Sequence, residues 1–219
     1  MLAELLPSAV ESAEVFGNGC DDGELLPAEK ELVANASEKR RREFTGARVC
    51  ARLALRRAGF RAAAILQGAS GAPQWPPGVV GSLTHCDGYR AAAVARTEAF
   101  SAIGIDAEPN TPLPQGVLAK VASESERAAL AKLARETPEI CSDKLIFSAK
   151  EATYKAWSPA TGRWLGFRDA EVEVDPGGTF TARLLVAGPL VGGRPLTAYE
   201  GRWAIGRGVV VTAVTVPSG

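Results

Sequence analysis

The sequence predicts an α+β fold made of two similar halves, in which helices pack on small, mainly antiparallel sheets. Two observations lead to this expectation. A stretch with helical periodicity precedes short strand-like segments in the first part of the chain, and the same succession returns after residue 116. Between them, residues 110–116 form a Pro-containing linker. We therefore expect an N-terminal half, residues 1–109, and a C-terminal half, residues 110–219.

The elements of the first half follow from its turn and cap residues. Residues 1–27 combine short apolar patches with glycines and acids, so they are expected to be irregular or briefly extended. Pro27 opens a helical pattern that runs to Gly59, a residue type that commonly ends helices. Glycines and prolines indicate a loop over residues 65–77. Strands are expected over residues 79–84, ending at His85, over 89–95 and over 102–105, with a hairpin turn at 87–88.

The second half is expected to start with a helix over residues 117–136, which Ser123 can restart. A central helix follows, with a polar start at residues 142–143 and a stop at Pro159. The remaining chain is typical of antiparallel strands joined by Gly-containing turns, over residues 171–174, 179–186, 198–205 and 209–216.

Composition narrows the class of protein. The 219 residues carry 25 basic and 25 acidic side chains, so no global field recruits nucleic acid or an anionic membrane. The first residues lack the features of a signal peptide, and no apolar run approaches the roughly 18–20 residues of a membrane span. Four cysteines lie far apart without a CxxC pair, which is typical of reduced, mostly buried thiols. We therefore expect a soluble, cytoplasmic protein.

The central helix carries charges in a pattern that can serve chemistry. Glu151 and Lys155 lie one turn apart, and Lys150 lies about 100° round the helix from Glu151. The helix is thus predicted to present a carboxylate between two ammonium groups. A solvated helix with an exposed Glu–Lys pair, worth about 0.2–0.5 kcal/mol, explains this segment equally well when it is taken alone.

Two further carboxylates strengthen the chemical interpretation. Asp106 and Glu108 are two residues apart in an extended segment, so both side chains lie on one side of it. Together with Glu151 they offer the hard oxygen ligands that Mg²⁺ prefers. His85, the only histidine, also ends a strand and can donate to a phosphate oxygen.

A basic helix completes the inventory. Arg41, Arg48 and Arg52 share one side of the 27–59 helix, and guanidinium groups bind phosphate bidentately, although a basic helix face is more often only solvated. No GxxxxGK[ST], GxGxxG or GxSxG motif is present. The residues alone therefore predict a Mg²⁺-dependent enzyme that acts on a nucleotide containing a diphosphate.

Four ordered motifs resemble those of the 4′-phosphopantetheinyl transferase superfamily. Residues 104–108 read GIDAE and residues 147–157 read FSAKEATYKAW, similar to the G-(I/V)-D-x-E and (F/W)-x-x-K-E-(A/S)-x-x-K signatures. Residues 71–76, GAPQWP, and 81–86, GSLTHC, are similar to its G-x-P-x-W-P and S-x-(S/T)-H motifs. Order, spacing and length resemble the bacterial subgroup that serves siderophore, nonribosomal peptide and polyketide assembly lines, which is enterobactin synthetase component D-like.

The resemblance implies a monomer with coenzyme A and Mg²⁺ in the cleft between the halves. The implied reaction moves the phosphopantetheine arm of coenzyme A to a serine of an acyl or peptidyl carrier protein and releases adenosine 3′,5′-bisphosphate. Carrier domains of polyketide, nonribosomal peptide or fatty acid synthases are the implied partners. Their acidic surface implies a basic area beside the cleft, and the segment after Pro109 is the implied docking element.

Site roles are also implied by the resemblance, residue by residue. Glu151 is the implied base, directly or through a water, and Lys150 assists departure of the bisphosphate. The implied catalytic residues are Glu151, Lys150, Lys155 and His85; the coenzyme A contacts are Arg40, Arg48, Thr84, His85, Asp106, Lys150 and Lys155; the magnesium ligands are Asp106, Ala107 through its carbonyl, Glu108 and Glu151. One departure is that Gln67 and Ser70 stand where relatives often carry a basic residue.

Two alternatives remain open from the sequence. A Mg²⁺-dependent phosphohydrolase can use the same carboxylates, but it releases its product without a carrier. A non-catalytic coenzyme A binder is the third interpretation, and the presence of Glu151 with its two lysines argues against it because a binder needs no base.

Overall fold

The computed structural model describes residues 1–17, 24–68 and 71–219. Cys20 and Ser70, which entered the sequence predictions, lie outside these residues. Among the described helices, none is both long and apolar enough to cross a bilayer. The three described cysteines, Cys50, Cys86 and Cys141, take part in no disulfide, and only Cys50 is fully buried.

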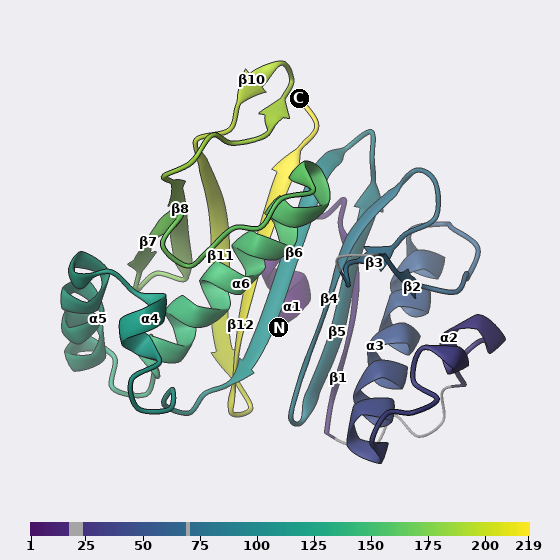
Figure 1. Cartoon of the computed structure of the whole chain (residues 1–219), viewed down its shortest axis with the longest axis horizontal. Coiled ribbons are helices and arrows are strands. Elements are labelled where there is room, and N and C mark those ends of the chain that lie inside the picture. Colours follow the sequence, from purple (N-terminus) through teal and green to yellow (C-terminus); the bar gives the residue numbers. More distant parts are fainter. Residues whose placement is uncertain (18–23, 69–70) are drawn as a thin grey trace.

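Two antiparallel sheets with a long helix on each form the architecture (Figure 1). The small sheet has the order β1-β5-β4, from strands Glu11–Phe16, Tyr89–Arg96 and Val79–Cys86, and helix α3, Glu38–Arg57, packs on it. The large sheet has the order β6-β12-β11-β8-β7, from strands Phe100–Pro109, Val209–Pro217, Ala198–Gly206, Thr179–Leu184 and Ala170–Asp175. Helix α6, Ser142–Thr161, packs on the large sheet. The predicted α+β class is confirmed.

Short elements surround this frame. They are helices α1, Leu2–Leu5, α2, Pro27–Glu31, α4, Leu118–Val121, and α5, Glu124–Glu136, and two small hairpins, β2–β3 at Leu66–Gln67 and Pro73–Gln74 and β9–β10 at Leu190–Val191 and Arg194–Pro195. Ser123 caps α5 by accepting a hydrogen bond from Glu126 N, and the Glu126 carboxylate accepts one from Ser123 N, so the restart expected there is real.

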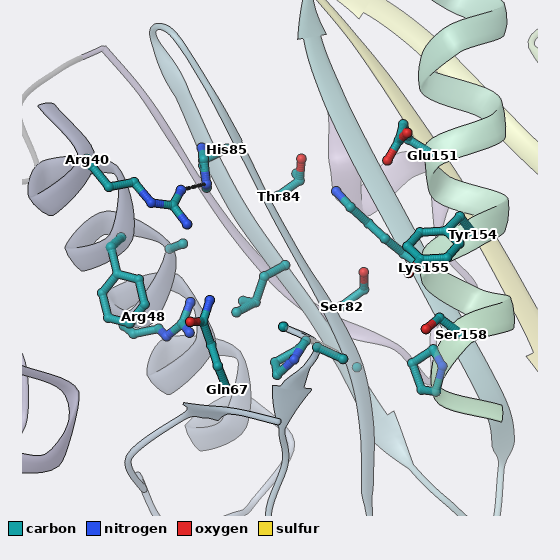
Figure 2. Close-up of a pocket in the computed structure, with 18 residues that line it drawn as sticks. Arg40, Arg48, Gln67, Ser82, Thr84, His85, Glu151, Tyr154, Lys155 and Ser158 are labelled. Atoms are coloured by element: carbon teal, nitrogen blue, oxygen red, sulfur yellow. Dashed lines mark hydrogen bonds between the residues drawn. The ribbon is translucent and has the colours of Figure 1, made fainter. Parts of the chain in front are cut away.

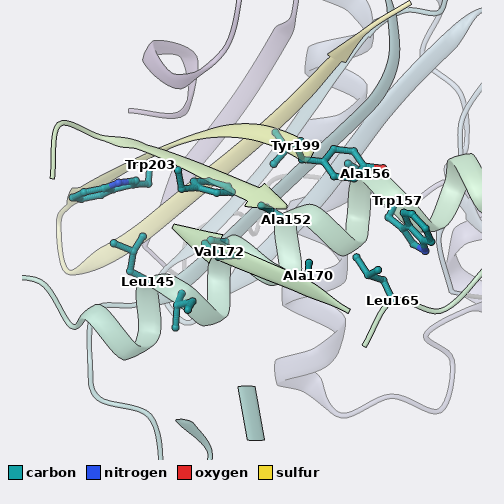
Figure 3. Close-up of a cluster of buried hydrophobic side chains, with 14 of the residues drawn as sticks. Leu145, Ala152, Ala156, Trp157, Leu165, Ala170, Val172, Tyr199 and Trp203 are labelled. Atoms are coloured by element: carbon teal, nitrogen blue, oxygen red, sulfur yellow. The ribbon is translucent and has the colours of Figure 1, made fainter. Parts of the chain in front are cut away.

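Apolar side chains form one core for each pair of layers. α6 contributes Ala149, Ala152, Ala156 and Trp157 to the core against the large sheet (Figure 3). A second core lies between α3 and the small sheet. A third core joins the two sheets themselves, because alternate residues of β5 pack against alternate residues of β6 and β12. Burial therefore fixes both halves against each other as well as internally.

The helical pattern of the first half differs from its prediction in continuity. The segment from Pro27 to Gly59 is not one helix: the chain leaves it after α2, and Ser37 caps a new helix by accepting from Arg40 N. Gly46 lies inside α3, beside the Arg90 side chain, without interrupting the helix. The predicted end holds, because Ala58 is the C-cap of α3 and Gly59 follows it with a positive φ of 81°.

The other differences concern the central helix and the extended segments. Pro159 lies inside α6 instead of ending it, and the helix ends at Gly162 in the left-handed conformation with φ of 65°. The segment 65–77, expected as a loop, contains the β2–β3 hairpin. Residues 11–16 form β1, and Asp106 and Glu108 lie within β6 and not after its end.

The third strand of the first half connects the two sheets in an unexpected way. β6 pairs with β12, so it is an edge of the large sheet although it precedes the 110–116 linker. Its other edge faces β4, and there side-chain hydroxyls of β4 accept the hydrogen bonds from backbone amides of β6. Ser82 Oγ accepts from Ile105 N at 3.1 Å, and Thr84 Oγ1 accepts from Ala107 N at 2.9 Å. We call this side-chain-mediated contact the β4–β6 seam.

Gly104 lets the central helix reach this strand. A Cβ atom at Gly104 would lie 1.9 Å from the Ala152 carbonyl oxygen and 2.7 Å from Ala156 N, distances that no side chain can occupy. The helix backbone therefore rests directly on β6. This contact brings the polar side of α6 to the level of Asp106.

Candidate active site

A pocket of about 340 Å³ lies beside the β4–β6 seam, between α3 and α6. Figure 2 shows Arg40, Arg48 and Gln67 on one wall and Glu151, Tyr154, Lys155 and Ser158 on the other. Ser82, Thr84 and His85 of β4 line it between the two walls. Six of the predicted site residues thus meet around one space: Arg40, Arg48, Thr84, His85, Glu151 and Lys155.

Arg48 is a buried cation that faces this space. Its side chain is stacked on the Phe44 ring, with the guanidinium carbon 3.8 Å from the ring centroid, and its Nε donates to Ile65 O at 3.0 Å. Burial lowers the pKa of Arg48 to about 10, with further lowering from Arg40 and Arg52, so it stays charged near neutrality. A fixed, desolvated guanidinium without a salt bridge among the described residues is suited to a ligand phosphate.

The remaining arginines of the predicted cluster have other partners. Arg52 donates to the fully buried carboxylate of Glu29 at 2.7 Å and to Glu24 O, and Arg41 donates to Ala36 O. Neither lines the pocket. Arg52 therefore does not replace the basic residue that relatives often carry, and Gln67 brings a neutral amide to that position of the pocket wall.

His85 joins α3 to the end of β4. Arg40 donates to His85 Nε2 at 2.7 Å, and His85 Nδ1 lies 3.7 Å from the Glu43 carboxylate. Burial, followed by the charge of Arg40, lowers the pKa of His85 to about 4. The imidazole is therefore uncharged near pH 7 in the free protein.

The opposite wall is acidic and partly neutralised. Lys155 Nζ donates to Asp106 Oδ1 at 2.7 Å and to Ile105 O at 3.1 Å, and Glu151 lies on the same helix one turn before Lys155. Asp106 is 5% exposed, and Thr84 donates to its Oδ1 at 3.5 Å. Burial raises the pKa of Glu151, and the charges of Asp106 and Glu108 raise it further. The three carboxylates are therefore close enough to influence one another.

Glu108 extends the acidic cluster along β6. Lys144, two turns before Glu151 on α6, donates to Glu108 at 3.4 Å. The pKa of Glu108 is raised by burial and by Asp106, while Lys144 opposes the shift. Cys86 lies beside the same carboxylates, and burial with their charge raises the pKa of its thiol to about 12, so the thiol stays protonated.

The acidic cluster fits a hard divalent cation by its chemistry. Asp106 Oδ2 is buried and has no hydrogen-bond partner among the described residues, which is costly for a carboxylate oxygen unless a cation faces it. Burial and, after it, the charge of Asp106 raise the pKa values of Glu108 and Glu151, so a cation beside these carboxylates would be favourable. As the side chains stand, the described part of the chain contains no group of three His, Cys, Asp or Glu that closes around an ion. Carboxylate oxygens are the ligands that Mg²⁺ prefers, and the unpartnered Asp106 Oδ2 is one of them.

Four predicted site residues do not line the pocket: Asp106, Ala107 and Glu108 lie beside it on β6, whereas Lys150 is directed away from it. Lys150 Nζ donates to the Glu126 carboxylate at 3.0 Å, to Phe167 O at 2.6 Å and to Ala170 O at 2.9 Å, and the residue is 4% exposed. Burial lowers the pKa of Lys150, against the opposing effect of Glu126. The three donors of its ammonium group are occupied, so the helix does not present Glu151 between two available lysines.

Sequence reasoning missed several residues of the site. Lys144 was detectable, because positions 144, 151 and 155 recur on one side of a helix. The capping box of Ser123 and Glu126 predicts the start of α5, but it does not indicate that Glu126 pairs with Lys150. Ser82 stood in a quoted motif without a role, and only the packing of β4 on β6 reveals its contact with Ile105 N.

Fold and site together define a class of protein. An α+β chain whose sheets meet at a pocket with buried arginine on one wall and a carboxylate cluster with a lysine on the other is suited to transfer or cleave a phosphate-linked group. Comparison with known proteins identifies the family to which the chain belongs. The model of the 4'-phosphopantetheinyl transferase N-terminal domain matches residues 28–95, and that of the 4'-phosphopantetheinyl transferase superfamily matches residues 102–209.

Individual relatives agree with the family models. The 4'-phosphopantetheinyl transferase Svp of Streptomyces mobaraensis is 55% identical over 99% of this chain and 89% of its own. The 4'-phosphopantetheinyl transferase Npt of Nocardia iowensis is 51% identical over 98% of this chain and 99% of its own. Enterobactin synthase component D of Escherichia coli O157:H7 is more distant, at 30% identity over 71% of this chain and 72% of its own.

The chain belongs to the 4′-phosphopantetheinyl transferase superfamily. It is accordingly an enzyme that transfers the phosphopantetheine arm of coenzyme A to a serine of a carrier protein. The resemblance deduced from the four sequence motifs is confirmed.

Proposed function

We propose that transfer depends on Mg²⁺ and takes place in the pocket beside the β4–β6 seam. Coenzyme A lies there with its phosphates toward Arg40, Arg48 and His85 on one wall and toward Lys155 on the other. The observation that carries the proposal is this pairing of walls: fixed cations opposite a carboxylate cluster, across a space lined by the hydroxyl of Thr84. Such an arrangement positions a diphosphate and leaves a base beside it.

Mg²⁺ would be held by the carboxylates of Asp106, Glu108 and Glu151, with the Ala107 carbonyl as a further ligand. When bound, it would supply positive charge that stabilises the diphosphate as its linkage breaks. The orphaned Asp106 Oδ2 and the raised pKa values of Glu108 and Glu151 support this assignment.

The protein's own groups then have distinct tasks. Glu151 lines the pocket from α6 and accepts the proton of the attacking serine. Lys155, held by Asp106 and Ile105 O, faces the phosphates from the same wall. Adenosine 3′,5′-bisphosphate leaves toward Arg40 and Arg48. Lys150 is not among these groups, since its ammonium lies with Glu126 away from the pocket.

The carrier proteins, the oligomeric state and the cellular location form a second part of the proposal. We assign the enzyme to carrier domains of polyketide, nonribosomal peptide or fatty acid synthases, including siderophore assembly, acting as a cytoplasmic monomer. The similarity to enterobactin synthase component D supports the siderophore assignment. The exposed side chains of Lys39 and Arg56 on α3 lie outside the pocket and can face an acidic carrier surface.

Intact-mass spectrometry of an apo carrier protein tests the reaction. With coenzyme A and Mg²⁺ the carrier should gain one phosphopantetheine mass, and EDTA should abolish the gain. Replacing Glu151 with Gln should slow transfer by about 10²–10⁴-fold while coenzyme A still binds, because the base is lost and the phosphate contacts remain.

Two outcomes would contradict the proposal. Breakdown of coenzyme A without carrier modification would identify a hydrolase. Binding of coenzyme A without any transfer to several carriers would leave a binding protein. A Glu173→Gln variant, changed on the exposed side of β7, serves as the matched control and should transfer at the normal rate.

A further inference from the structure

The contacts of His85 fix the position of its proton. Arg40 and Glu43 lie one turn apart on α3, and both reach the imidazole at the end of β4. A guanidinium group has only donors, so the Nε2 atom that it contacts at 2.7 Å must accept. In the neutral ring the proton is then on Nδ1, which is the nitrogen that faces the Glu43 carboxylate at 3.7 Å.

This tautomer is unsuited to a phosphate ligand. An unprotonated Nε2 presents a lone pair, which repels an anionic oxygen that engages Arg40. The neutral ring can avoid the repulsion by moving its proton to Nε2, but Nδ1 would then direct a lone pair at the Glu43 carboxylate. Uptake of a second proton avoids both repulsions, since Nε2–H donates to the phosphate and Nδ1–H to Glu43.

We propose that Glu43 is a positioning residue for coenzyme A binding: it keeps a proton on Nδ1 of His85 and stabilises the imidazolium that forms when a phosphate group engages Arg40. This inference rests on the proposed binding of coenzyme A in the pocket. Glu43 touches no substrate in this scheme. The Glu43 side chain is 12% exposed and that of His85 31%, so their interaction is only partly screened by solvent.

The charges around His85 give the direction of the pH effect. The imidazole is influenced by Arg40 and Glu43 from α3, by Arg90 from β5 and by Lys155 from α6. Burial and these cations lower its pKa to about 4 in the free protein, and a bound phosphate offsets the cations. Because the complex then holds more protons than the free protein, coenzyme A should bind more weakly as pH rises above this value.

Nitrogen NMR of the imidazole tests the tautomer directly. His85 is the only histidine, so its ring signals need no assignment by mutation. In the free protein we expect one protonated nitrogen, Nδ1. In the coenzyme A complex near neutral pH we expect both nitrogens to be protonated. After Glu43→Ala the complex should instead contain a neutral ring with its proton on Nε2.

Calorimetry in buffers of different ionisation enthalpy measures the proton taken up on binding. The wild type should take up roughly one proton per coenzyme A more than Glu43→Ala, whose affinity should fall about threefold to tenfold. Proton release by the 3′-phosphate, with a second pKa of about 6, is common to all variants and cancels in the comparison. Glu43→Gln, which keeps an acceptor without the charge, should also lose the uptake.

Glu38→Ala is the matched control, because Glu38 lies on the same helix, carries the same charge and pairs with Arg42 at the surface. It should behave as the wild type. A free protein with its proton on Nε2, or an unchanged imidazolium and proton uptake in Glu43→Ala, overturns the role of Glu43. Absence of any coenzyme A binding by the wild type overturns the proposed site itself.

Discussion

At the scale of single residues, Asp106 shows how the site balances its charge. One of its oxygens accepts from Lys155, and the other is buried without a partner in the described part of the chain. Burial raises the pKa values of Glu108 and Glu151, and the nearby charge of Asp106 raises them further. The folded protein therefore retains a cluster of mutually repelling carboxylates, and any cation that joins them stabilises the fold as well as the substrate.

Mg²⁺ should raise the thermal stability of the wild type. At a concentration 100-fold above its dissociation constant, the ion adds about 2.7 kcal/mol to the free energy of unfolding. Asp106→Asn should abolish this increment, because it removes one negative ligand. Differential scanning fluorimetry with and without Mg²⁺ measures both. An exposed-turn variant, Asp175→Asn, should keep the full increment, and an unchanged increment in Asp106→Asn would argue against this metal site.

Residue types could be predicted from the sequence more reliably than the directions of their side chains. The motifs identified Asp106, Glu151 and Lys155, which the structure places together. Lys150 was predicted for the same pocket because the family motif includes it. Its direction is decided by Glu126 and two carbonyl groups on elements whose placement no local pattern encodes.

At the scale of elements, the approach of α6 to β6 determines the geometry of the site. Gly104 permits backbone-to-backbone contact between them, and Lys150 ties the other side of the helix to α5, to Phe167 before β7 and to the first residue of β7. The helix is thus held on two sides. Glu151 and Lys155 face the pocket because of both contacts.

Gly104→Ala should displace α6 from β6. The added methyl group would overlap the Ala152 carbonyl oxygen, which belongs to a helix backbone and cannot rotate away. We expect a loss of at least about 1–3 kcal/mol in the free energy of unfolding, measured by urea denaturation, and a larger relative loss of transfer. Gly68→Ala, where the nearest atom would lie 3.6 Å from the new Cβ, should cost much less. Equal losses in the two variants would contradict the close approach.

Lys150→Ala should lower stability more than coenzyme A affinity. It leaves the Glu126 carboxylate buried without its cation, which costs about 3–5 kcal/mol in comparable ion pairs. Denaturation measures the first quantity and calorimetry the second. The double variant Lys150→Met with Glu126→Gln should recover part of the stability. A stable Lys150→Ala variant that no longer binds coenzyme A would instead support the phosphate contact of Lys150 that was predicted from the sequence.

At the scale of the whole molecule, the two sheets meet along the β4–β6 seam and a shared apolar core. Turn and strand signals predicted β4, β5 and β6 in the first half and β7, β8, β11 and β12 in the second, but not β1 or the two small hairpins, and the α+β class followed from these signals. Pairing could not be predicted, because β6 and β12 are about a hundred residues apart and the hydroxyls of Ser82 and Thr84 carry no local signature of a contact between sheets.

Ser82→Ala combined with Thr84→Val should loosen the two halves. The amides of Ile105 and Ala107 lose their acceptors, which costs about 1–3 kcal/mol for each buried group left unpaired. Hydrogen exchange at these two amides should accelerate, while amides in the centre of the large sheet keep their protection. Thr181→Val, a hydroxyl that bonds Glu200 at the surface of β8, is the control and should leave both amides protected. Unchanged exchange would show that the apolar core alone holds the sheets.

The position of β12 affects the order in which the enzyme can mature. This strand is the last in chain order, yet it lies between β6 and β11 and has neighbours on both sides. Every predicted site residue is translated before residue 156, but Asp106 and Glu108 have no place in the large sheet until residues 209–217 arrive. A nascent chain therefore carries the complete set of catalytic groups for some fifty residues of synthesis without a working site, and a premature stop before Val209 leaves all of them present and unassembled.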